Sequence, residues 1–84
     1  MNITPEQIKT ALVAFFSTPE MLPAGGYSVT AEYPGRGYWE VTIYTPAGVD
    51  FQSFRVAVEV KNGKLEFTHH AYRAPIGTAE IPAA

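Results

Sequence analysis

The two histidines of the chain, His69 and His70, are neighbours in the sequence. Because successive residues of a β-strand point to opposite faces, their imidazoles cannot ligate one metal ion from a regular strand. The sequence contains no cysteine, no His-x-His pair and no His-Glu-x-x-His motif that could complete a zinc site. We therefore expect no metal site and no cofactor.

Nucleophilic catalysis requires a serine, threonine or cysteine beside an oriented base. Ser28, Ser53, His70 and Glu66 could be combined into such a set on paper. An open sheet in a chain of 84 residues offers little material for a pocket that excludes water. We therefore expect no enzymatic activity.

Two glycine-rich segments, residues 25–26 and 35–37, have a composition found in phosphate-binding loops. Such a loop follows a strand and leads into the N-terminus of a helix. Strand-like sequence flanks segment 35–37, and segment 25–26 leads into another strand-like stretch. We interpret both segments as turns.

The composition is that of a weakly acidic globular protein. Six Lys and Arg residues stand against eight Asp and Glu, for a formal charge of -2, and 46% of the residues are hydrophobic. This is too apolar for a disordered chain and too weakly basic for phosphate-driven binding, so we expect no direct nucleic acid partner. The sequence lacks an apolar run of the ~18 residues that span a membrane and the pattern of a signal peptide. We therefore expect no membrane partner and a cytoplasmic location.

A helix is predicted over residues 4–17. Thr4 and Gln7 have the spacing of a capping box, and Pro5 suits the first helical position because its missing N–H needs no partner there. Apolar residues then recur on one side of the helix at Ile8, Ala11, Leu12, Phe15 and Phe16. Proline and glycine interrupt any continuation, so residues 18–26 are predicted to be a connector.

From residue 27 the apolar residues recur at every second position, which is the period of half-buried strands. Four strands are predicted, at about residues 27–33, 38–45, 51–60 and 65–73, followed by a tail at 74–84.

Turn chemistry predicts the registers of the first and last hairpins. Asn62-Gly63 is a pair that tight two-residue hairpins prefer, and a loop at 35–37 keeps the apolar positions of the first two strands on one face. For the middle hairpin, matching of faces places Ile43 opposite Val56 and Val41 opposite Val58. A bulge is expected near residues 52–53.

These elements predict an α+β fold, with one N-terminal helix packed on one face of a four-stranded antiparallel meander in the order 1-2-3-4. The whole chain, residues 1–84, is expected to form a single domain. The predicted core comprises Ile8, Leu12, Phe15, Phe16, Val29, Trp39, Val41, Ile43, Phe54, Val56, Val58 and Phe67. In outline the order of helix and meander resembles that of cystatin-type and PepSY-type small domains. The resemblance covers architecture alone and implies no function, because no cystatin-style inhibitory loop motif is present.

The sheet face turned away from the helix holds the candidate site. With the registers above, four carboxylates form one row across all strands: Glu32, Glu40, Glu59 and Glu66. Adjacent strands lie about 4.8 Å apart, so these like charges would be close neighbours. A second row places Tyr44 opposite Arg55, and Arg55 in turn opposite His70. Tyr72 lies next to this row. Tyr and Arg are enriched at interface centres, which makes these eight residues candidates for partner binding. A solvated face whose charges protect the sheet edges explains the same residues.

We therefore expect a non-enzymatic interaction module that binds a protein partner, or a second copy of itself, through the open sheet face. One alternative is a small-ligand binder or minor enzyme, with a pocket between the Phe15-Phe16 end of the helix, the 18–26 connector and the sheet. Another is an inhibitor that mimics a phosphate backbone with its carboxylate row, although such mimics carry far more charge than -2.

Overall fold

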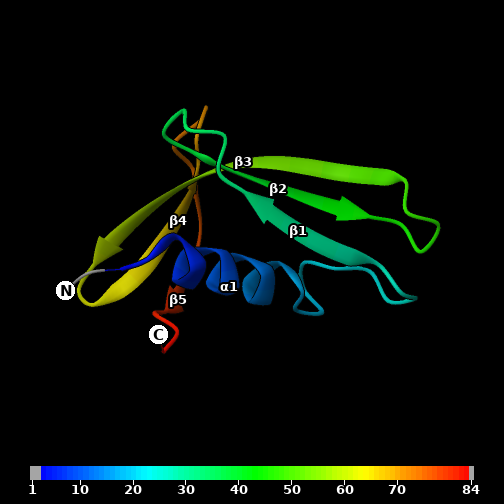
Figure 1. Cartoon of the computed structure of the whole chain (residues 1–84), viewed down its shortest axis with the longest axis horizontal. Helices are drawn as coiled ribbons and strands as arrows, with labels where there is room; N and C mark the ends of the chain where they lie inside the picture. The colour runs from blue at the N-terminus through cyan, green and yellow to red at the C-terminus, as the bar shows by residue number, and fades with distance from the viewer. Residues whose placement is uncertain (1–2, 84) are drawn as a thin grey trace.

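The computed structural model describes residues 3–83 of the chain and places one helix ahead of a five-stranded antiparallel sheet (Figure 1). The elements, in chain order, are α1 (Pro5–Phe16), β1 (Ser28–Glu32), β2 (Trp39–Tyr44), β3 (Asp50–Lys61), β4 (Lys64–His69) and β5 (Pro75–Glu80). The predicted α+β architecture, with one helix on an antiparallel sheet, is confirmed. The predicted number of four strands is wrong, because the chain forms a fifth.

The helix begins at the capping box that the sequence predicts. Thr4 Oγ1 accepts a hydrogen bond from Gln7 N at 3.2 Å, and Gln7 Oε1 accepts one from Thr4 N at 2.8 Å. These two bonds satisfy backbone N–H groups that have no partner within the helix. The apolar stripe of the helix then packs on the sheet, with Leu12 and Phe16 fully buried and Phe15 half-buried.

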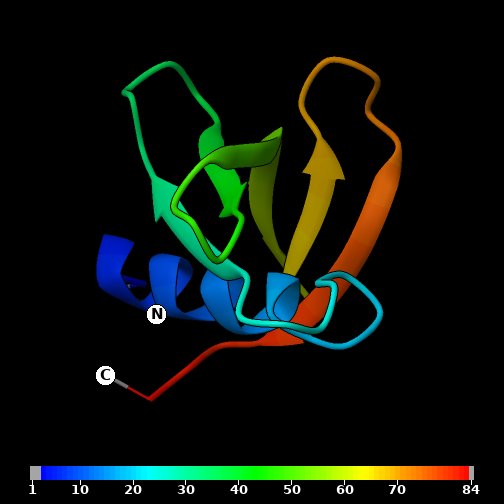
Figure 2. The same ribbon diagram turned by 90° about the vertical axis from the view of Figure 1, so that its right-hand side faces the viewer.

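The strands of the sheet lie in sequence order from β1 to β5. The middle strand, β3, pairs with β2 along its first half and with β4 along its second half. Residues 50–56 of β3 pair with β2, whereas residues 56–61 pair with β4, so Val56 alone has partners in both strands. Figure 1 shows β3 crossing from one half of the sheet to the other above α1. Figure 2 shows the helix beneath the sheet, with the β1–β2 and β4–β5 loops rising on the side away from it.

The fifth strand lies in the segment that the sequence predicts to be a tail. Strand β4 ends at His69 instead of continuing to residue 73, and the chain turns back through Arg73, whose φ is 58°. Pro75 is tolerated because it occupies the first position of an edge strand. Beyond β5, the Pro82 carbonyl accepts a 2.8 Å hydrogen bond from Gln7 Nε2, which ties this end of the chain to the start of α1.

Two of the three predicted registers are confirmed. Strands β1 and β2 pair Val29 with Ile43, and β3 and β4 pair Val58 with Phe67. The Asn62-Gly63 turn has the positive φ values, 53° and 74°, that its sequence predicts.

The predicted register of β2 against β3 is wrong by four residues. Val41 pairs with Phe54 instead of Val58, and Val56 pairs with Trp39 instead of Ile43. The intervening loop is shorter than predicted, because Thr45 N donates to the Val49 carbonyl at 2.8 Å and closes the turn. The bulge lies slightly earlier than predicted, where the register shifts between Ile43↔Gln52 and Tyr44↔Asp50.

The core lies between α1 and the sheet. Trp39 is 7% exposed, as its predicted core position requires, and belongs to the same buried cluster as Leu12 and Phe67. Five predicted core residues are half-buried at the margin: Ile8, Phe15, Val29, Phe54 and Val58. The buried set also contains residues outside the predicted core: Ala11, Ala31, Tyr38 and Leu65. No helix within residues 3–83 is long and apolar enough to cross a membrane.

Candidate interaction surface

The open face of the sheet is the face turned away from α1. Its polar residues alternate with the core residues along each strand. The exposed ones include Ser28, Thr30, Glu32, Glu40, Ser53, Arg55 and Glu59.

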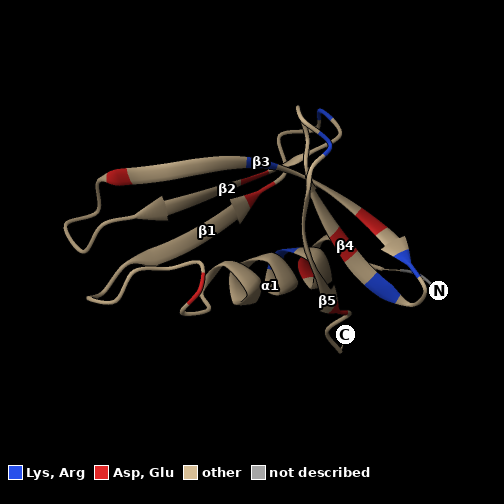
Figure 3. Cartoon of the chain, turned by 180° about the vertical axis from the view of Figure 1, so that it is seen from behind, with Lys and Arg blue, Asp and Glu red and all other residues tan. Residues whose placement is uncertain are grey.

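The four carboxylates do not form the single row that the sequence predicts. Glu32 pairs with Glu40 on β1 and β2, and Glu59 pairs with Glu66 on β3 and β4. The register of β2 against β3 places Arg55, not Glu59, opposite Glu40. Figure 3 shows the resulting separation, with one pair on each half of the sheet. The proposal that these carboxylates mimic a phosphate backbone therefore loses the continuous row on which it depends.

Two lysines of the β3–β4 hairpin form ion pairs, and one of them, Lys61, partly compensates Glu66 of the second carboxylate pair. Lys61 Nζ lies 3.5 Å from Glu66 Oε1, and Lys64 Nζ lies 3.5 Å from Glu80 Oε1. These ion pairs are solvent-exposed at the hairpin tip, where such pairs contribute little to stability.

The corrected register also separates Tyr44 from Arg55. Tyr44 pairs with Ser28 on one side and Asp50 on the other, whereas Arg55 pairs with Glu40, four residues away along β2. At about 3.4 Å per residue, four residues correspond to ~14 Å along the strand. The two side chains cannot form one anchor, contrary to the prediction.

Arg55 and His70, by contrast, meet on the open face, and Tyr38 lies with them. The Arg55 Cζ atom lies 5.3 Å from the centroid of the Tyr38 ring, in the range of a cation–π contact. The His70 ring lies 4.8 Å from the Tyr38 ring, centroid to centroid. In addition, His70 N donates a 2.9 Å hydrogen bond to the Arg55 carbonyl. We call Tyr38, Arg55 and His70 the Arg55 stack.

Tyr38 is the member of the Arg55 stack that the sequence interpretation missed. It immediately precedes β2, shares the open-face phase of Glu40, and is only 7% exposed. The sequence did contain a signal for it: Tyr38 is a large aromatic at a strand position that otherwise holds polar, open-face residues. Such a side chain needs a packing partner on the open face. The β1–β2 loop brings it there, and His70 comes from the turn that directly follows β4.

Tyr72 lies near Arg55 but is not one of the three residues of the Arg55 stack. It is 83% exposed in the β4–β5 loop, and its ring is 6.4 Å from that of His69, not His70. A pocket of about 320 Å³ adjoins it and is lined by Ser53, Phe54, Arg55, His69, Ala71 and Tyr72.

The residues that could have formed a catalytic set are dispersed. Ser53 shares a 3.1 Å hydrogen bond between side-chain oxygens with Thr42. Ser28 pairs with Tyr44 at one side of the sheet, while Glu66 lies on β4 beside Lys61. No group of three or more His, Cys, Asp or Glu residues within the described part of the chain could hold a metal ion.

The alternative function predicts a pocket between the Phe15-Phe16 end of α1, the connector and the sheet. At the connector, a pocket of about 380 Å³ is lined by residues of the segment 17–27, and neither Phe15 nor Phe16 contributes to it. An open apolar pocket between the helix and the sheet lies at the opposite end of α1, beside Pro5 and Ile8.

Comparisons of the chain with protein-family models, curated proteins and solved structures found no match.

Proposed function

We propose that this chain is a non-enzymatic interaction module that binds a protein partner, or a second copy of itself, through the open sheet face at the Arg55 stack. The partner is expected in the cytoplasm and to be neither nucleic acid nor membrane. The observation that carries the proposal is the placement of an exposed arginine on a buried tyrosine ring. The same tyrosine ring also contacts the ring of His70, from the turn after β4.

The Arg55 stack has the properties of an interface anchor. Binding costs free energy when it immobilises a long side chain, and a guanidinium that already rests on an aromatic ring has less freedom to lose. Arginine and tyrosine are also the residue types that most often dominate binding energy at interface centres.

The chemistry of the guanidinium indicates what the partner presents. Within residues 3–83, Arg55 forms no ion pair with a carboxylate, although Glu40 is its neighbour in the register. Its planar donors remain able to bind a carboxylate in a bidentate manner. We therefore infer that the partner contributes an Asp or Glu side chain at this point, with Glu32 and Glu40 at the margin of the interface.

The test compares Arg55→Ala and Arg55→Lys with the wild-type chain. Light scattering after size-exclusion chromatography measures self-association. Affinity capture from the native cell, quantified by mass spectrometry, measures binding of a partner. We expect Arg55→Ala to weaken association by about thirtyfold, since anchors of this type contribute 2 kcal/mol or more. Arg55→Lys should associate almost as weakly as Arg55→Ala, because lysine lacks the planar guanidinium that binds a carboxylate through two parallel hydrogen bonds.

Arg36→Ala is the matched control, because Arg36 is an exposed arginine in the β1–β2 loop. It should retain both association and the folded circular dichroism spectrum, as should Tyr44→Ala. Association of Arg55→Ala at the wild-type level would exclude the Arg55 stack as the binding site.

A further inference from the structure

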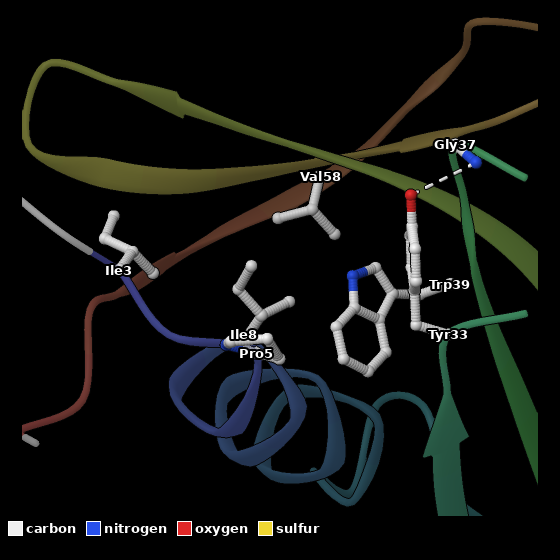
Figure 4. Close-up of a pocket in the computed structure, with 7 residues that line it drawn as sticks. All are labelled: Ile3, Pro5, Ile8, Tyr33, Gly37, Trp39 and Val58. Atoms are coloured by element: carbon white, nitrogen blue, oxygen red, sulfur yellow. Dashed lines mark hydrogen bonds between the residues drawn. The ribbon is translucent and has the colours of Figure 1, made fainter. Parts of the chain in front are cut away.

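A second surface feature, separate from the Arg55 stack, lies beside the N-terminal end of α1. It is a pocket of about 310 Å³ between the helix, the β1–β2 hairpin and β3 (Figure 4). Its lining residues are Ile3, Pro5, Ile8, Tyr33, Gly37, Trp39 and Val58. All but Tyr33 and Gly37 are large and apolar, and none is charged.

Two aromatic rings form one side of this pocket. The centroids of Tyr33 and Trp39 lie 5.4 Å apart, and their ring planes are inclined at 53°. Trp39 is 7% exposed and belongs to the core, whereas Tyr33 is 52% exposed. Trp39 is therefore a rigid wall and Tyr33 a rim that solvent reaches. Figure 4 shows Ile3, Ile8 and Val58 around the same space.

The aromatic side also supplies hydrogen-bond donors. The Tyr33 hydroxyl oxygen accepts a bond from Gly37 N at 3.3 Å, which leaves its own proton free to be donated. Figure 4 shows the indole nitrogen of Trp39 directed toward the space between Ile8 and Val58. An indole N–H can donate but cannot accept. The pocket thus offers apolar walls and donors, without a charge.

We propose that this pocket is a binding site for a small neutral molecule with one planar ring and a hydrogen-bond acceptor, such as an aryl ketone. Its volume lies at the lower limit of ligand pockets, about 300 Å³, and exceeds the ~150 Å³ cavity that holds benzene in another protein. The absence of lining charges favours a neutral ligand, since a charged one would lose hydration without a counter-charge. This site does not depend on the function proposed for the open face.

The sole tryptophan of the chain reports on this site directly. A ¹⁵N-labelled sample of the whole chain has a single indole N–H cross-peak, because Trp39 is the only tryptophan. Titration with acetophenone, a neutral ring with one carbonyl acceptor, should shift that cross-peak to saturation. Ethylbenzene has a similar shape without the acceptor, and we expect it to bind about fivefold more weakly. Benzoate, which has the ring and a negative charge, should also bind more weakly than acetophenone.

Variants then test the location of the site. Tyr33→Ser should weaken acetophenone binding by about tenfold, because it removes one aromatic wall and keeps the chain folded at an exposed position. Tyr72→Ser is the matched control, an exposed tyrosine outside the pocket. It should leave the affinity unchanged. Tyr33→Phe should retain ring binding but reduce the preference for acetophenone over ethylbenzene.

Three outcomes would overturn the proposal. The first is an indole cross-peak that does not shift to saturation up to the solubility limit of acetophenone. The second is an affinity of Tyr33→Ser equal to that of the wild type. The third is equal binding of ethylbenzene and acetophenone, which would refute the acceptor-bearing ligand class. Each can be observed whether or not the Arg55 stack binds a protein.

Discussion

Phe15 of α1 packs directly against the backbone of Gly77 in β5. A Cβ atom at residue 77 would lie 2.5 Å from Phe15 Cζ and 2.7 Å from Phe15 Cε2, closer than real Cβ contacts allow. The same Phe15 ring packs edge-on against Phe67, with ring centroids 5.2 Å apart. The fifth strand can therefore approach the helix only because residue 77 has no side chain.

We expect Gly77→Ala to destabilise the protein by about 1–3 kcal/mol, the usual cost of forcing extra volume into a packed site. Urea unfolding followed by circular dichroism measures the change. Thr78→Ala, at the adjacent exposed position, should change stability by less than about 0.5 kcal/mol. Equal effects of the two substitutions would show that β5 does not pack on Phe15 in this way.

Charge reversals on the open face test the register of β2 against β3. Glu59→Lys replaces a like-charge pair with an attractive one, because Glu66 lies opposite, and should stabilise by a few tenths to about 1 kcal/mol. Glu40→Lys removes the repulsion from Glu32 but places a second cation opposite Arg55, so it should give little net change.

The two reversals are compared by urea unfolding at low and high salt, which screens exposed charges. The stabilisation by Glu59→Lys should decrease as salt is added. A single row of carboxylates would instead make both reversals stabilising to a similar extent, so that result would contradict the observed register.

The Asn62-Gly63 turn should be sensitive to the side chain at its second position. Gly63 has a φ of 74°, where a β-branched residue is strained. Gly63→Val should cost about 1–3 kcal/mol, as residues held in disfavoured backbone regions do. Lys64→Ala, which removes an exposed ion pair, should cost no more than about 1 kcal/mol by the same unfolding measurement. A similar loss in both variants would contradict a turn that depends on positive φ.

Trp39→Ala should remove a large part of the stability of the chain. Truncation of a buried aromatic costs about 3–5 kcal/mol, and a domain of this length has a stability of only about 4–12 kcal/mol. The loss of dispersion in an amide NMR spectrum and a lowered melting temperature by circular dichroism would report it. A variant that melts at the wild-type temperature would contradict the core position of Trp39.

The elements that the sequence predicted correctly are those specified by residues near one another in the chain. The capping box of Thr4 and Gln7 spans one helical turn, and the Asn62-Gly63 turn spans two residues. Each local signal determines its own geometry without help from the rest of the fold. The alternation of apolar residues likewise determined which side of each strand faces the helix.

The register of β2 against β3 could not be determined in the same way. A shift of four residues moves Val56 from Ile43 to Trp39 and leaves every side chain on its original face, because the strand period is two. The hydrophobic pattern therefore favours both registers equally. The hydrogen bond that closes the loop between Thr45 and Val49 selects one of the two registers. This loop has no Asn-Gly pair of the kind that predicted the last hairpin.

Only the tertiary structure determined the fifth strand and the composition of the candidate site. Strand β5 has a proline and a glycine in six residues, a local composition that disfavours strands, yet Gly77 is what its packing on Phe15 requires. The Arg55 stack joins Tyr38, Arg55 and His70 from three separate segments of the chain. The physical reason is the same in both cases: contacts between distant segments depend on shape and space, which a local sequence pattern does not encode.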